Sequence, residues 1–135
     1  MRRAIAGILA GLVAWTLIVT VLNWGLRLYL PGYTEAEPTM LFTLGMKIAR
    51  LSIAAVTSVA AGALVRVIAP GSRLAPWIVG LVMLVLFVPV HIQLWSRFPA
   101  WYHLTFLITL APLVALGAQL VPRNADRHGA ERHAV

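Results

Sequence analysis

Cysteine is absent from this chain of 135 residues, and carboxylates are scarce. Without thiols, the protein forms neither disulfides nor thiolate metal sites. Only four residues are acidic, namely Glu35, Glu37, Asp126 and Glu131, and none lies in a long apolar run. Charged residues make up 11% of the chain and hydrophobic residues 61%, against ~45–50% apolar residues in soluble domains. The composition therefore excludes a water-soluble domain and indicates a membrane protein.

Signatures of catalysis are also missing. The chain contains no Gly-x-Ser-x-Gly nucleophile motif, no His-Glu-x-x-His zinc helix and no glycine-rich phosphate loop. Proton-coupled exporters of similar size, such as the small multidrug resistance family, carry a glutamate in the first span, where this chain has no carboxylate. The sequence predicts a protein without catalytic activity of its own, and we expect no cofactor and no metal site.

Long runs without charge occupy most of the chain. Twenty-three residues separate Arg3 from Arg27, twenty-three separate Arg73 from Arg97, and twenty-five separate Arg97 from Arg123. A helix needs about 20 mostly apolar residues to cross a bilayer. These runs predict an all-α polytopic membrane protein, a four-helix transmembrane bundle over residues 1–122. The expected spans are about 4–26, 44–67, 76–95 and 101–121, followed by a mobile polar cytoplasmic tail over 123–135.

Basic residues are unevenly divided between the two sides of such a bundle. If the N-terminus is cytoplasmic, seven of them face the cytoplasm and four face the outside. The seven are Arg2, Arg3, Arg66, Arg73, Arg123, Arg127 and Arg132, and the four are Arg27, Lys47, Arg50 and Arg97. The excess predicts an N-in, C-in orientation.

The second span has the least room between its charges. Only fifteen residues separate Arg50 from Arg66, which corresponds to about 22 Å of helix against a hydrocarbon core of about 30 Å. At least one of these charges must reach into the membrane. We expect Arg66 to snorkel toward the inner headgroups, while Arg50 either snorkels or points into the bundle.

One face of the second span carries both basic and small residues. At about 100° per residue, Lys47 and Arg50 share a broad face with the helix-packing candidates Ala54, Ser58 and Ala61. Small residues let membrane helices approach closely. If this face packs against other helices, the two cations point into the bundle.

Polar residues from all four spans reach the same outer level in this topology. They are Asn23 and Arg27 in the first span, Lys47 and Arg50 in the second, His91 in the third and His103 in the fourth. Ionisable groups at membrane depth are costly and point to a site. A cationic group favours an anion, either a lipid phosphate or a carboxylated amphiphile. The alternative is that Glu35 and Glu37 fold back from the loop and neutralise the cations without any ligand.

The two histidines raise a further alternative. Imidazoles on neighbouring antiparallel helices can ligate haem, although a hydrogen-bonded structural role explains His103 as well. His91 follows Pro89, whose missing amide donor is expected to kink the third span.

A Gly-x-x-x-Gly segment lies in the first span. Gly7 and Gly11 are spaced for close helix contact. We expect this contact within the bundle, with a homodimer seam as the alternative.

These features predict a small structural or accessory protein of the bacterial inner membrane. Its outer cationic cluster is expected to contact an anionic lipid of the bilayer or a partner membrane protein, and no nucleic acid, because the basic residues lie singly at the ends of apolar runs. One alternative is a carrier or permease for a small amphiphilic anion. The other is a bis-histidine haem or redox subunit.

Overall fold

The computed structural model of the protein describes residues 1–122, and all regular structure within them is helical. The long helices are α1 (Arg2–Tyr29), α3 (Leu44–Ile68), α4 (Ala75–Gln93) and α5 (Ala100–Leu120), and the short α2 (Tyr33–Ala36) follows α1. Each long helix is long and apolar enough to cross a membrane. The prediction of an all-α chain with four long apolar helices is confirmed for these residues. The predicted tail, 123–135, lies outside them.

Local sequence explains where the helices end. The α1 helix stops at Tyr29, just before Pro31, and Gly32 then takes a positive φ of 77°, which glycine adopts without steric cost. The α3 helix begins after Thr43, whose side chain accepts a hydrogen bond from the Met46 amide. The sequence did not predict α2, a helix of only four residues.

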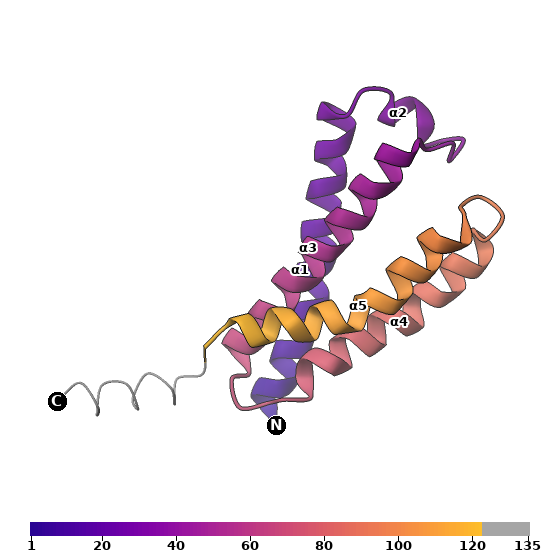
Figure 1. Ribbon diagram of the computed structural model, residues 1–135. Helices are drawn as coiled ribbons and strands as arrows, with labels where there is room; N and C mark the ends of the chain where they lie inside the picture. Colours follow the sequence, from indigo (N-terminus) through magenta and orange to yellow (C-terminus); the bar gives the residue numbers. More distant parts are fainter. Residues whose placement is uncertain (123–135) are drawn as a thin grey trace.

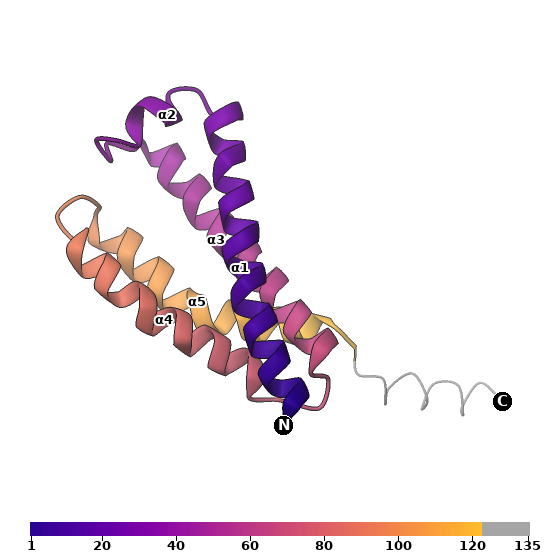
Figure 2. The ribbon, with the colours of Figure 1, turned by 180° about the vertical axis from the view of Figure 1, so that it is seen from behind.

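The long helices form two hairpins, α1 with α3 and α4 with α5. Figure 1 shows the hairpins crossing near the N-terminus and diverging toward α2, and Figure 2 shows the same arrangement from behind. We call the end with the N-terminus and the α3–α4 loop (69–74) the closed end. The end with α2 and the α4–α5 loop (94–99) is the open end. The most extensive helix contacts are those of α3 with α5 and with α1, so α3 is central.

Glycines allow the hairpins to cross. A Cβ atom on Gly62 of α3 would lie 1.8 Å from the Val114 carbonyl oxygen, and one on Gly117 of α5 would lie 1.9 Å from the Val59 carbonyl oxygen. No side chain fits in either space. The backbones of α3 and α5 are therefore in direct contact at the crossing.

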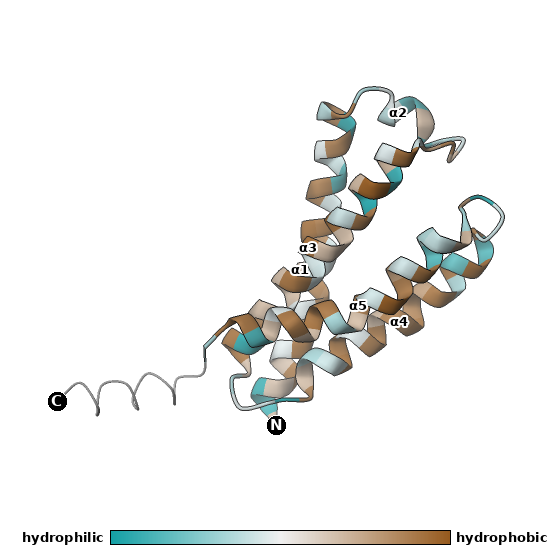
Figure 3. Ribbon diagram, in the orientation of Figure 1, coloured by the Kyte–Doolittle hydropathy of each residue, from teal (hydrophilic) through white to brown (hydrophobic). Residues whose placement is uncertain are grey.

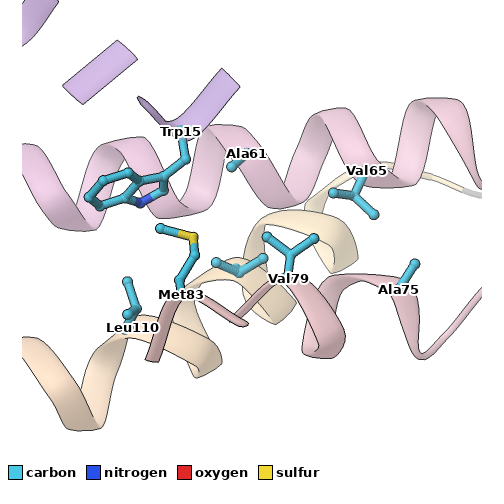
Figure 4. Close-up of a cluster of buried hydrophobic side chains, with 8 residues drawn as sticks. Trp15, Ala61, Val65, Ala75, Val79, Met83 and Leu110 are labelled. Atoms are coloured by element: carbon cyan, nitrogen blue, oxygen red, sulfur yellow. The ribbon is translucent and has the colours of Figure 1, made fainter. Parts of the chain in front are cut away.

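An apolar core lies around this crossing. Figure 4 shows Trp15, Val65, Val79 and other buried side chains meeting between the helices. Trp15 donates a hydrogen bond from its indole nitrogen to Ser58 Oγ at 3.1 Å, so the polar atom of the tryptophan is satisfied inside the core.

The predicted small-residue positions pack within the chain. A Cβ on Gly7 would lie 3.1 Å from Ala69 Cβ, and one on Gly11 would lie 2.6 Å from Val65 Cγ2. The side chains of Ala54, Ser58 and Ala61 are buried. Gly7 and Gly11 thus contact the α3 side of the bundle, and this contact needs no second copy of the chain.

The outer faces of the bundle are apolar. Figure 3 shows brown and pale residues along most of the four long helices, with teal residues mainly toward their ends. Large side chains such as Leu9, Leu17 and Ile108 are more than half exposed. An apolar exterior over four long helices is typical of a multi-pass membrane protein.

Backbone carbonyls of α5 and of the α3–α4 loop hold the Arg66 side chain. Arg66 is only 8% exposed. Its guanidinium donates from Nε to the Ala118 carbonyl and from Nη1 to the Pro70 carbonyl, both at 3.0 Å. The sequence interpretation of Arg66 as a snorkelling anchor stays a prediction, and it missed these two carbonyl acceptors, one of which comes from α5.

Candidate anion-binding site

Arg50 joins the two hairpins at the open end. Its Nε donates a hydrogen bond to Tyr102 Oη of α5 at 3.3 Å, and its Nη1 donates a short one to Tyr33 Oη of α2. Its Cζ atom lies 4.8 Å from the centroid of the Phe42 ring, within cation–π distance. The side chain is half-buried, so the guanidinium points between the helices.

Aromatic side chains surround this guanidinium. Phe42 stacks on Phe98 with ring centroids 5.8 Å apart, and Phe98 stacks on Tyr102 at 4.7 Å. Together with Tyr33 and Met46 these rings form a buried cluster, which we call the aromatic bridge. It connects the α2–α3 region with the α4–α5 hairpin where the helix backbones diverge.

A cavity of about 200 Å³ adjoins Arg50 and receives side chains from all four long helices. Its lining is Trp15, Val19, Asn23, Arg50, Ala54, Phe87, Tyr102 and Phe106. Arg50 is the one charged group among these mainly apolar and aromatic residues. The volume exceeds that of several water molecules, each occupying about 30 Å³, so a small charged group fits there.

Hydrogen bonds hold the polar lining in place. Tyr33 Oη donates to Asn23 Oδ1 at 3.4 Å, and Asn23 Nδ2 donates to the Val19 carbonyl at 2.9 Å. Burial raises the pKa of the Tyr33 phenol above its usual value, even though the nearby Arg50 acts in the opposite direction. The phenol therefore stays protonated and donates to Asn23 while it accepts from Arg50.

No carboxylate neutralises Arg50 among residues 1–122. The single ion pair in this part of the chain joins Arg27 to Glu37, with 2.6 Å between Nε and Oε2. Two phenol oxygens and an aromatic face solvate Arg50 but leave its charge uncompensated. Because a buried cation is costly without a counter-charge, this guanidinium favours an anion in the adjoining cavity.

A second hollow runs beside the first. A groove of about 260 Å³ lies between α3 and α5, and it shares Ala54 and Phe106 with the Arg50 cavity. Most of its lining is apolar, with Ile48, Leu51 and Leu113 among the residues. A cationic cavity that adjoins an apolar groove matches the two parts of an amphiphile.

His91 and His103 lie close to this site and contact each other. Their Nδ1 atoms are 2.7 Å apart, so one ring donates and the other accepts. His103 is fully buried and its Nε2 atom has no hydrogen-bond partner within residues 1–122. A buried N–H without a partner costs more than a bare lone pair, which favours His103 Nδ1 as the donor.

This pairing bears on the haem alternative. Metal–imidazole bonds are about 2 Å long, so two imidazole nitrogens on opposite faces of one haem iron would lie about 4 Å apart. The observed contact is shorter, and Trp95 stacks on His103 with centroids 4.7 Å apart. The packed pair therefore gives haem ligation no support.

The predicted site residues separate into three groups. Asn23 and Arg50 meet through Tyr33 and line one cavity. Arg27 is paired with Glu37, while Glu35 is exposed. The remaining members, Lys47, His91 and His103, do not line the Arg50 cavity. Lys47 is half-buried, its backbone amide donates to the Thr43 carbonyl, and its side chain makes no hydrogen bond within the described part of the chain.

Sequence reasoning missed the aromatic members of the site. Aromatic residues are common at membrane interfaces, so their presence there did not indicate a contact with Arg50. The residues concerned are Tyr33, Phe42, Phe98 and Tyr102. The available signal was chemical: a phenol oxygen accepts a hydrogen bond from arginine, and an aromatic ring attracts the cation.

No protein-family model, no curated protein and no solved structure matches this chain.

Proposed function

We propose that this protein is an accessory component of a membrane and binds an anionic amphiphile, with the charged group of the ligand beside Arg50. The observation that supports this most is the half-buried guanidinium, which lines a cavity and faces no carboxylate within residues 1–122. Arginine binds phosphates and carboxylates through parallel hydrogen bonds. A phosphate or carboxylate would supply the missing negative charge.

The ligand's apolar part would occupy the groove between α3 and α5. This groove adjoins the cavity at Ala54 and Phe106 and is mainly apolar. A chain lying there would contact the protein on one side and the bilayer on the other. The ligand class is therefore a single-headed anionic lipid or a long-chain carboxylate.

The proposal includes a place and an orientation. We assign the protein to the bacterial inner membrane with both ends of the bundle's chain on the cytoplasmic side, because seven of eleven basic residues then face the cytoplasm. The open end, with Arg50, would belong to the outer leaflet. Binding of a partner membrane protein is the alternative role of the same cationic surface.

Lipid retention tests the proposal. Native mass spectrometry of the protein purified with equal amounts of an anionic phosphatidylglycerol and a zwitterionic phosphatidylcholine should show preferential retention of the anionic lipid. Arg50→Gln should reduce that retention about tenfold or more, since charge-assisted hydrogen bonds contribute about 1.5–3 kcal/mol. Arg50→Lys should fall between the two because it keeps the charge and loses the planar fork.

Arg97→Gln is the matched control for this experiment. Arg97 is exposed at the same end of the bundle and does not line the cavity, so the variant loses equal charge outside the site. Helical circular dichroism should be unchanged in all three variants. Equal retention by the Arg50 and Arg97 variants would contradict the proposal, because it would reduce the effect to general surface charge.

The carrier alternative uses the same site but needs motion. A carrier would have to open its cavity toward the closed end, where Gly62 and Gly117 bring two backbones into contact. Uptake of a labelled long-chain carboxylate into vesicles, lost in Arg50→Gln, would favour the carrier. Binding without flux would favour the accessory role.

A further inference from the structure

A second cationic cavity lies at the closed end of the bundle. It has a volume of about 260 Å³ and lies where α3, α4 and α5 meet. Its lining is Arg66, Arg73, Pro76, Trp77, Ala115, Ala118 and Gln119. It shares no residue with the Arg50 cavity, so it is a separate site.

Arg66 is fixed in this cavity by the crossing of α3 and α5. Direct backbone contact at Gly62 and Gly117 brings the Ala118 carbonyl to Arg66 Nε, and the Pro70 carbonyl takes Nη1. The hydrogen bonds within residues 1–122 leave Nη2 without a protein partner. Carbonyl acceptors orient the guanidinium but do not neutralise its charge. The Nη2 hydrogens of Arg66 therefore remain available to donate to a ligand.

The surroundings add positive potential and polar contacts. Arg73 lines the same cavity from the α3–α4 loop, and the first turn of α4 begins at Ala75 beside it. The positive end of a helix dipole favours an anion. Trp77 and Gln119 complete a rim with an indole and an amide, and tryptophan is typical of the headgroup level of a bilayer.

We propose that this cavity binds a phosphate group, with Arg66 and Arg73 as its ligands. Two arginines can share the oxygens of one phosphate, whereas a carboxylate has only two oxygens to offer. Basic cavities between membrane helices bind phospholipid headgroups, and free phosphate has the same chemistry. The two sources differ in whether an acyl chain is needed.

The five tryptophans of the chain allow both cavities to be observed in one experiment. Protein labelled with 5-fluorotryptophan should give one fluorine resonance for each, assigned through single Trp→Phe variants. Trp77 borders the closed-end cavity, and Trp15 borders the Arg50 cavity. Titration with a short-chain phosphatidic acid should shift the Trp77 resonance, and phosphatidylcholine should not.

Free phosphate identifies the source of the ligand. A Trp77 shift with sodium phosphate at the concentration that saturates the phosphatidic acid response assigns the site to phosphate itself. A shift with the lipid alone assigns it to a lipid headgroup. Both results support the proposal, and an unmoved Trp77 resonance in both titrations would overturn it. The Trp15 resonance reports separately on the proposed function, so either site can fail alone.

Charge variants separate the site from general surface charge. Arg73→Gln should weaken the apparent affinity about tenfold, because it removes a charge-assisted contact. Arg2→Gln removes an exposed charge near the same end, outside the cavity lining, and should change the affinity less than twofold. Arg66→Gln should abolish the response. If the Arg66→Gln variant unfolds, Arg73→Gln still tests the proposal. Equal effects of Arg73→Gln and Arg2→Gln would overturn the proposal.

Discussion

At the scale of the residue, two phenols and an aromatic ring hold an arginine that has no carboxylate partner within residues 1–122. Arg50 donates to Tyr33 and Tyr102 and lies over Phe42. Each contact disperses positive charge without cancelling it. The arginine is therefore held in a defined position with its charge uncompensated, as the proposed anion site requires.

Tyr33 supplies a prediction on pH. Burial raises the pKa of its phenol above the ordinary value of about 10. The folded protein thus holds this proton more tightly than the unfolded chain does. The stability that comes from the protonated phenol is complete below pH of about 10 and is lost as the pH rises through the folded-state pKa.

An ultraviolet titration of tyrosinate checks this prediction. The titration should contain a step at a higher pH than that of a free phenol, and Tyr33→Phe should remove this late step. The same variant should lower stability near neutral pH by about 1–3 kcal/mol, because Asn23 Oδ1 loses its donor. A wild-type curve with no step above the ordinary range would be inconsistent with a buried Tyr33.

At the scale of the element, glycine decides how α3 and α5 cross. Gly62→Ala and Gly117→Ala place a methyl group within 2 Å of a carbonyl oxygen on the opposing helix. The helices must separate, so we expect each variant to lose about 1–3 kcal/mol or more of stability. Thermal unfolding in detergent, followed by circular dichroism, measures the loss.

Gly25→Ala is the control for the crossing. It makes the same chemical change in α1, where a new Cβ would meet nothing within 4 Å. Alanine is the better helix former by about 1 kcal/mol, so this variant should be unchanged or slightly more stable. If all three variants unfolded at one temperature, close backbone contact would not be what holds α3 against α5.

The helices were predictable from the sequence, and their crossing was not. Apolar runs between charges indicated four spans because length and hydropathy are local properties. The closest contact depends on which glycine of α3 meets which residue of α5, and Gly62 looked ordinary in a helix rich in alanine. Likewise, Arg50 could be singled out from its depth, whereas Tyr33 and Tyr102 join it only through α2 and the α4–α5 hairpin. Tertiary contacts of this kind leave no periodic signal.

At the scale of the whole molecule, the two hairpins make unequal ends. The hairpins meet at the closed end, where backbones are in direct contact, and diverge toward the open end (Figure 1). Side chains of the aromatic bridge connect them at the open end. Each end has a cavity lined by arginine. The ends lie on opposite sides of the apolar zone, so the bundle would contact anions in both leaflets.

Because the chain lacks cysteine, single cysteines can report which end faces which side. Thr39→Cys and Ser96→Cys mark loops at the open end, and Gly71→Cys marks the closed end, all at exposed positions. With the N-terminus inside, a membrane-impermeant maleimide added to intact cells should label positions 39 and 96. Position 71 should react only after permeabilisation.

The pattern of labelling distinguishes two kinds of failure. Labelling of position 71 alone in intact cells would indicate the opposite orientation. It would still agree with four membrane spans, because the two ends would lie on opposite sides. The Arg50 site would then belong to the inner leaflet and the Arg66 site to the outer one. Equal reaction of all three cysteines in intact cells would contradict the spanning bundle itself. In such a bundle, one membrane crossing separates position 71 from position 39 and another separates it from position 96, so position 71 must lie on the opposite side from the other two.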